Sequence, residues 1–297
     1  APTLGPILCS TVPVPDLEAA TGAYVDTFGW VVQAEGTVDG ALAGLWGTPA
    51  AAGARWRLVG AAPGRPGGVR LVERPGLDLA QSPLRVPGWR SIEICVQDVH
   101  EVRRMVEGSP FRTLADPAPL GPDSPIWAMQ ATGPGREMLY LTQTPPNSGF
   151  DLPLAEHKVD KQFIAVLSAP SLEEARDWYA AAFAAGPELP PEPYVLVACA
   201  TDAGQPVDAL HRLGALCLAG QTLVEIDEHF PGLEGERAPA GDLRPGIAMV
   251  TWEVPSLDAV AQLLRGAPAV RAEAPYGGRR VGVAAGAAGE LLELVER

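Results

Sequence analysis

The chain has 297 residues, 47% of them hydrophobic and 20% charged, and this composition excludes a disordered protein. A formal net charge of −14 argues against nucleic acid as a partner, because binding to phosphate requires clustered Lys and Arg. The length predicts about two domains. The lack of a basic signal-peptide start and of a hydrophobic run of roughly 18 residues predicts a cytoplasmic protein without a membrane partner. The four cysteines contain no CxxC pair, which excludes zinc-finger and thioredoxin-type sites.

Four times along the chain, a hydrophobic, β-prone run is followed by the start of a helix. The starts lie at 15–20, 97–102, 170–175 and 255–260. Each has Asp or Ser at its second position, where a short side-chain oxygen accepts hydrogen bonds from the free amides of the first turn. The first helix is expected to end at Gly29. The predicted N-caps are Asp16, Asp98, Ser171 and Ser256.

A strand with alternating hydrophobic residues closes each of the four repeats. These strands lie at 69–73, 139–143, 224–228 and 292–296. Alternation sends their first and third residues toward a helix layer and the second residue to the opposite face. The second residues are Arg70, Tyr140, Glu225 and Glu293. The first and last strands read VRLVER and LELVER, yet Arg70 occupies the position of Glu293.

The repeat length of roughly 70–85 residues accommodates one strand, one helix and about three more strands, which is a βαβββ unit. Residues 144–161 are rich in Pro and polar residues and are typical of a linker. We therefore predict an α+β fold of four βαβββ units in two tandem, cup-shaped domains. The predicted boundaries are 1–145 for the first domain, 146–160 for the linker and 161–297 for the second domain.

With these features the chain resembles the vicinal oxygen chelate superfamily, which includes glyoxalase I, extradiol dioxygenases, methylmalonyl-CoA epimerase and bleomycin-resistance proteins. The resemblance rests on the stretch VPVPDLEAATGAYVDTFGW and on the closing strands LVEIDE and LELVER. It covers nearly the whole chain, and four units in one chain is similar to the layout of the extradiol dioxygenases. The resemblance implies that units close into cups in pairs, the first with the second and the third with the fourth.

The resemblance also implies metal ligands, usually His on each opening strand and Glu on each closing strand. The opening places fall on Cys9, Ser91, Ile164 and Met249, and the closing places on Arg70, Tyr140, Glu225 and Glu293. No opening strand supplies His, a guanidinium cannot ligate a metal, and two carboxylates alone are a poor site for Fe(II), Zn²⁺ or Ni²⁺. We therefore expect no metal and no cofactor. A divergent metal site that combines His211 or His229 with Glu225 and Asp227 is the alternative.

A cup without metal is still a concave pocket for a small molecule, and the chain has seven tryptophans that could wall it. In the predicted first cup, Arg70 either binds an anionic group of the substrate or pairs with Glu93. In the predicted second cup, Glu225 and Glu293 either form a general base or are relics. The predicted catalytic residues are Glu225, Glu293, Arg70 and Tyr140. The predicted substrate-binding residues are Cys9, Ser91, Glu93, Trp46, Trp56, Trp127 and Met249.

Two functions stay open on this basis. The first is a metal-independent lyase, isomerase or cyclase that acts on a small aromatic or polyketide-like molecule. The second is a non-catalytic protein that sequesters a drug or metabolite, as the bleomycin-resistance resemblance implies. Four units in one chain and ionisable residues at cup positions favour the enzyme, while the loss of His ligands and the abundant Trp favour the binder. A metal-dependent dioxygenase or glyoxalase comes third, and we expect a monomer or homodimer.

Overall fold

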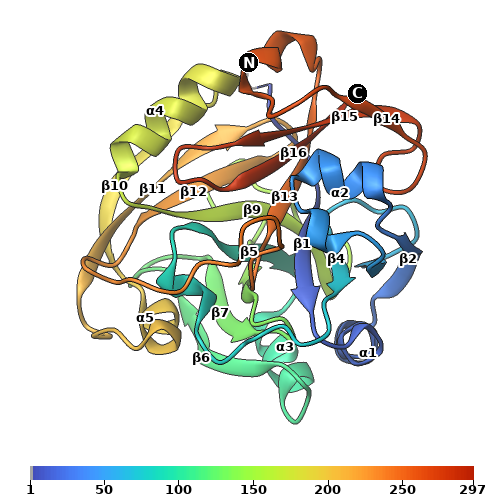
Figure 1. Ribbon diagram of the computed structural model, residues 1–297. Coiled ribbons are helices and arrows are strands. Elements are labelled where there is room, and N and C mark those ends of the chain that lie inside the picture. Colours follow the sequence, from blue (N-terminus) through green and yellow to red (C-terminus); the bar gives the residue numbers. More distant parts are fainter. Residues whose placement is uncertain (1–2) are drawn as a thin grey trace.

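The computed structural model describes residues 3–297, in which each quarter of the chain forms one βαβββ unit (Figure 1). The first unit contains β1 (Ile7–Val14), α1 (Leu17–Phe28), β2 (Val31–Thr37), α2 (Gly40–Trp46), β3 (Arg55–Gly60) and β4 (Gly68–Glu73). The second contains β5 (Gly88–Val96), α3 (Val99–Val106), β6 (Arg112–Pro119), β7 (Trp127–Thr132) and β8 (Met138–Gln143). The third contains β9 (Val159–Ala169), α4 (Leu172–Phe183), β10 (Glu188–Val195), α5 (Val197–Ala203), β11 (Leu210–Leu218) and β12 (Thr222–Glu228). The fourth contains β13 (Met249–Val254), the 3₁₀ segment η3 (Asp258–Leu263), β14 (Ala269–Arg271), β15 (Arg279–Ala285) and β16 (Leu291–Glu296). The α+β fold of four units is confirmed.

The two eight-stranded sheets combine these units in an unexpected way. One sheet has the order β14-β15-β16-β13-β1-β4-β3-β2, so it joins the first unit to the fourth. The other has the order β10-β11-β12-β9-β5-β8-β7-β6, so it joins the second unit to the third. Figure 1 shows the blue first unit beside the red fourth. The predicted pairing of first with second and third with fourth is therefore wrong, and the predicted linker at 146–160 separates two units that share a sheet.

In the middle of each sheet, one antiparallel strand pair joins the two units. Strand β1 pairs with β13, with Thr11 opposite Met249. Strand β5 pairs with β9, with Ser91 opposite Val166. We call the cup face of the first sheet the outer cup, because it is built from the first and last units. We call the cup face of the second sheet the inner cup.

The helix starts follow the predicted capping chemistry in three units of four. The side chains of Asp16, Asp98 and Ser171 accept hydrogen bonds from first-turn amides, and Gly29 ends α1 in the left-handed conformation. The predicted cap at Ser256 is wrong. The fourth unit has the 3₁₀ segment η3 in this place, and the amide of Leu257 donates to the carboxylate of Glu296 instead. Among residues 3–297, no helix is long and hydrophobic enough to cross a membrane.

The alternating closing strands place their residues as predicted. Val69 and Leu71, like the equivalent residues of the other three closing strands, belong to one large hydrophobic core that also contains the buried residues of α1, α3 and α4. This core includes side chains from both sheets, so the helix-covered faces of the two sheets are joined. The second residues of the closing strands point to the opposite faces, which are the two cups.

Two equivalent buried hydrogen bonds also link the sheets. Tyr24 on α1 donates to Glu137 in the turn before β8 at 2.6 Å, and Tyr179 on α4 donates to Glu290 in the turn before β16 at 2.8 Å. Each bond connects a helix of one sheet to a turn of the other. The Glu137 turn approaches β1 so closely that a Cβ at Gly135 would lie 2.6 Å from Val12, so only glycine fits.

Candidate functional site

The outer cup contains a closed ion pair. Arg70 Nη2 lies 2.8 Å from Glu293 Oε1, and Thr251 donates to the same oxygen at 2.7 Å. Glu293 Oε2 accepts from Tyr276 OH at 2.8 Å and from Trp46 Nε1 at 2.5 Å. Arg70 is 1% exposed and Glu293 is 0% exposed. The carboxylate therefore has four donors and no access to solvent.

The guanidinium of Arg70 is equally enclosed. It lies 4.7 Å from the ring centre of Trp46 and 5.7 Å from that of Tyr276. Its Nε donates to Thr11 at 2.9 Å and its Nη1 to Tyr276 OH at 2.6 Å. Burial alone would lower the pKa of Arg70, but Glu293 and Tyr276 outweigh it and raise this pKa. The outer cup is thus filled by a cation that the chain itself supplies.

The other residues predicted for substrate binding in this region fill the same cup. Met249 Sδ lies 3.7 Å from Arg70 Nη2, and Cys9 donates to Thr251 at 3.4 Å. Burial raises the pKa of the Cys9 thiol. Trp56 is buried in the same hydrophobic cluster. Trp127 faces neither cup, because it lies on the helix-covered side of β7 with its ring 5.3 Å from that of His100.

The inner cup is built around a second buried guanidinium. Arg90 Nη1 donates to Asp227 Oδ2 at 2.9 Å, and Arg90 Nη2 donates to Ser168 Oγ at 2.9 Å. Ser168 lies 2.9 Å from His229 Nδ1 and donates to it, because His229 Nε2 faces the carbonyl of Leu233 at 3.0 Å. Arg90 would face the helices by simple alternation. A β-bulge between Trp89 and Ser91 turns it into the cup.

Three carboxyl groups gather in this cup. Burial and the neighbouring Asp227 raise the pKa of Glu225 well above its ordinary value. Burial raises the pKa of Glu93 to about 7, although Thr142 donates to its Oε1 at 2.7 Å. The pKa of Asp227 is also raised by burial, against the opposing effect of Arg90. Glu225 and Asp227 lie two residues apart on the same face of β12, so each carboxyl group affects the ionisation of the other.

Tyr140 lies beside these carboxyl groups. Its hydroxyl is 2.9 Å from Cys199 Sγ on α5, a helix that covers part of the inner cup. Burial raises the pKa of both groups, that of Cys199 to about 11, so the phenol and the thiol are neutral at pH 7. Tyr140 and Glu225 are only half-buried, whereas the equivalent outer-cup pair, Glu293 and Arg70, is enclosed.

Buried polar atoms without a hydrogen-bond partner are concentrated in the inner cup. Six such side-chain atoms occur in residues 3–297, and four of them belong to this cup or its rim. Native proteins leave few such atoms, because an unpaired buried polar group is costly. The four atoms are Arg90 Nε, Ser91 Oγ, His211 Nε2 and Asp227 Oδ1. The inner cup is therefore incompletely satisfied by the protein alone.

A cavity of about 540 Å³ opens where β9 and β12 end and β11 begins, beside the inner cup. Its lining includes His211, His229 and Phe230, and the rest is mostly Pro, Ala and Leu. Phe230 makes a T-shaped contact with His211, with ring centres 4.7 Å apart, and its ring lies 4.9 Å from the guanidinium of Arg90, so the cavity wall contacts the charged cluster directly. Burial, with a smaller effect of Arg90, lowers the pKa of His211.

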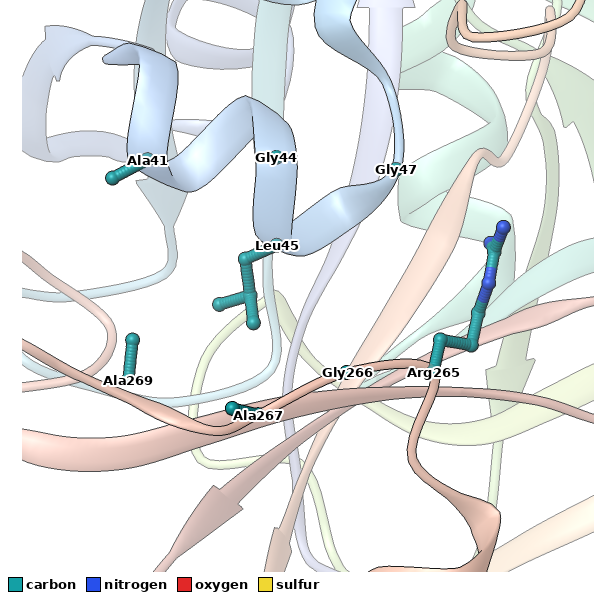
Figure 2. Close-up of a pocket in the computed structure, with 8 residues that line it drawn as sticks. All are labelled: Ala41, Gly44, Leu45, Gly47, Arg265, Gly266, Ala267 and Ala269. Atoms are coloured by element: carbon teal, nitrogen blue, oxygen red, sulfur yellow. The ribbon is translucent and has the colours of Figure 1, made fainter.

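A second hollow of about 300 Å³ lies between α2 and residues 265–269 (Figure 2). Figure 2 shows that its lining is mostly Gly and Ala, with Leu45 and the exposed Arg265 as the larger side chains. It contains none of the groups described in the two cups.

Comparisons with known proteins give matches only in structure. No protein-family model and no curated protein sequence matches the chain. Glyoxalase I from Zea mays superposes with a TM-score of 0.64 and 15% identity, over 98% of this chain and 92% of that one. A putative dioxygenase from Bacillus subtilis superposes with a TM-score of 0.62 and 12% identity, over 100% of this chain and 86% of that one. The chain has the vicinal oxygen chelate fold.

The resemblance to the vicinal oxygen chelate superfamily implies metal ligands on the opening and closing strands, and the residues at these places do not fit a metal. The ligand places of the outer cup hold Cys9, Arg70, Met249 and Glu293. The guanidinium of Arg70 is paired with the carboxylate of Glu293, so this carboxylate is not free to bind a metal. The ligand places of the inner cup hold Ser91, Tyr140, Ile164 and Glu225, with one carboxyl and no imidazole. Within residues 3–297, no three His, Cys, Asp or Glu side chains converge as metal ligands, which includes the alternative set around His211 and His229.

The vicinal oxygen chelate topology thus separates residues that the sequence prediction had combined. Glu225 and Glu293 lie in different cups, as do Arg70 and Tyr140, and the predicted pair of Arg70 with Glu93 does not form. The inner cup brings Ser91, Glu93, Tyr140 and Glu225 together. Arg90, Cys199 and Tyr276 were missed. Only Tyr276 carried a sequence signal, as a tyrosine beside the Gly277–Gly278 pair that precedes β15.

Proposed function

We propose that the inner cup is the acid–base site of a metal-independent lyase or isomerase, acting on a small carbonyl compound of aromatic or polyketide-like type. The observation that carries the proposal is the half-buried carboxyl of Glu225, which forms no ion pair within residues 3–297 and lies beside Tyr140 and Glu93. Two carboxyl groups whose surroundings set different pKa values are a recurrent acid–base arrangement in enzymes.

In this proposal Glu225 is the acid and Glu93 is the base. The raised pKa of Glu225 favours its protonated form, which can donate a proton to a carbonyl oxygen or a leaving group. Glu93, with a pKa of about 7, is about half ionised and can accept the proton from the adjacent carbon. The C–H electron pair becomes the C=C bond of the enol. Return of a proton at another carbon gives isomerisation, and departure of a leaving group gives elimination.

Tyr140 would stabilise the charge that develops on the substrate oxygen. Its phenol is neutral at pH 7, half-buried and directed into the same cup. A positioned neutral donor in a water-poor site strengthens as negative charge develops on its acceptor. The cavity beside Phe230 offers a mostly apolar wall for the rest of the molecule and lies in the size range of small-molecule sites.

The test is untargeted mass spectrometry of a bacterial metabolite extract before and after incubation with the protein. An enzyme consumes one compound far beyond one molar equivalent and yields a product, and Tyr140→Phe slows this conversion. Capture of a compound at no more than one equivalent, released unchanged on denaturation, would replace the proposal by the second candidate, a sequestering protein. That candidate draws support from α5, which covers part of the cup.

A further inference from the structure

We infer that the inner cup takes a ligand with a positively charged group, an ammonium or a guanidinium, held by the carboxyl groups of Glu225 and Asp227. This inference rests on the proposed function, because it assigns the ligand to the same cup. It goes further by naming the charge of the ligand, which the acid–base chemistry alone does not require.

The outer cup shows what this architecture does with a cation. The outer cup is filled by the guanidinium of Arg70, a residue of β4. This group lies close to the rings of Trp46 and Tyr276 and forms an ion pair with Glu293. The cup is fully buried and leaves none of these groups unpartnered. One of the two similar cups is therefore filled by a cationic side chain of the protein itself, and this side chain satisfies the polar groups around it.

The strand registers identify the equivalent positions in the other cup. Arg70 lies opposite Thr11 on β1, and Glu225 lies opposite Val166 on β9. Thr11 in turn lies opposite Met249, as Val166 lies opposite Ser91. Glu225 in the inner cup is thus equivalent in position to Arg70 in the outer cup. In the inner cup that position supplies a carboxyl instead, and the tethered cation is missing.

The charges of the inner cup are unbalanced as a result. Among the residues that the structure describes, Arg90 is the single buried guanidinium of this cup, and its ion pair is with Asp227. Glu93 and Glu225 form no ion pair with any Lys or Arg in residues 3–297. Three carboxyl groups thus face one cation, whereas the outer cup has one of each. A nearby cation lowers the pKa of a carboxyl group, so a cationic ligand would favour the ionised forms of Glu225 and Glu93 and would be held by their charge.

Unpartnered buried atoms give independent support for a ligand. Asp227 is 0% exposed, and its Oδ1 accepts no hydrogen bond although its Oδ2 is paired with Arg90. Ser91, 1% exposed, lies on the same cup face with its Oγ unpartnered. An ammonium or guanidinium carries several N–H donors and no acceptor, so it suits carboxyl and hydroxyl oxygens of this kind. Phe230 and the prolines of the adjacent cavity can hold an apolar body.

The experiment compares two probes of nearly the same shape. Benzamidine is a planar cation, and benzamide is its neutral counterpart. Binding of each to the full chain is measured by titration calorimetry at pH 7, with amide NMR shifts on β5, β8 and β12 to locate the site. We expect benzamidine to bind in the inner cup and benzamide to bind at least tenfold more weakly, since charge-assisted hydrogen bonds are the stronger ones.

Matched variants complete the test. Glu225→Gln and Glu93→Gln keep the side-chain shapes and are expected to weaken benzamidine binding by about tenfold each. Glu107→Gln changes the net charge equally at an exposed residue and is expected to leave binding unchanged. Equal binding of both probes in the inner cup would overturn the charge inference and leave the acid–base proposal standing. The inference would also be overturned if benzamidine did not bind at concentrations up to millimolar, or if Glu225→Gln left its binding unchanged. Failure of the proposed function would be seen separately, as absence of turnover.

Discussion

Arg70 and Glu293 occupy the same position in two nearly identical closing strands, and they form a buried ion pair with each other across the outer cup. Their side chains meet at 2.8 Å, although 223 residues separate them in the chain. The charge reversal between VRLVER and LELVER thus has a structural reason, because the two strands belong to units that share one sheet. Opposite charges at equivalent positions can neutralise each other only if these two units face the same cup.

This relationship predicts a strong effect on stability. Arg70→Met leaves the carboxylate of Glu293 buried without its cation, and we expect it to lower the free energy of unfolding by about 3–5 kcal/mol. The measurement is urea unfolding followed by Trp fluorescence. The double variant Arg70→Met with Glu293→Gln should lose less than the sum of the two single variants. A single-variant loss below about 1 kcal/mol would show that the pair is not enclosed as described.

The buried carboxyl of Glu137 predicts that stability falls as pH rises. Burial raises its folded pKa to about 7, from 4.5 in the ordinary state, so between these values the folded protein binds more protons than the unfolded chain. Its contribution is fully present below about pH 4.5 and is lost as pH rises through about 7. A shift of this size corresponds to about 3 kcal/mol.

The check is urea unfolding at pH 5 and at pH 8. The wild-type protein should be more stable at pH 5, and Glu137→Gln should reduce the difference, because the amide has no proton to lose. Glu107→Gln, at an exposed residue, should leave the difference as it is. A wild-type protein that is more stable at pH 8 would contradict this assignment.

The two tyrosine–glutamate bonds predict equal and moderate contributions to the junction between the sheets. Tyr24→Phe and Tyr179→Phe each remove one buried hydrogen bond to a carboxyl group while they retain the ring, and each should cost about 1.5–3 kcal/mol. Urea unfolding measures the loss. Because the two bonds share no residue, their effects should add in the double variant. Strong non-additivity would mean that the two links form one unit.

The acid–base roles predict a particular dependence of turnover on pH. Conversion should increase as pH rises through about 7, because the base Glu93 must be ionised before it can accept a proton. Glu93→Gln should remove this limb and reduce turnover by about 10²- to 10⁴-fold. Initial rates between pH 5 and pH 9 test this once the substrate is found. A rate that falls through pH 7, with Glu93→Gln fully active, would assign the base elsewhere.

Much of the fold could be predicted from the sequence because it depends on local rules. Alternation fixed which residues of each closing strand face the helices, and the short polar caps at Asp16, Asp98 and Ser171 marked three helix starts. Ser256 misled because the competing acceptor, Glu296, lies 40 residues away on another strand. Local spacing contains no information about such a partner.

The pairing of the units could not be deduced from alternation alone. Every unit offers the same kind of opening strand, so β1 could pair with β5 or with β13 on pattern alone. The signal that discriminates them is the opposite charge of Arg70 and Glu293. Arg90 was hidden for a different reason, because the bulge before Ser91 reverses the face that alternation predicts. That Arg90 belongs to the inner cup could therefore be learned only from the structure.

We propose that the inner cup is open to chemistry, whereas the outer cup is filled by the ion pair of Arg70 and Glu293. The measurement that tests it most directly is the mass-spectrometric turnover assay on two variants, each altered in one cup. Glu225→Gln changes the inner cup, and Met249→Leu is a volume-conserving change in the outer cup. We expect Glu225→Gln to abolish conversion and Met249→Leu to retain it within about twofold. The reverse pattern, with conversion lost in Met249→Leu and kept in Glu225→Gln, would contradict the claim.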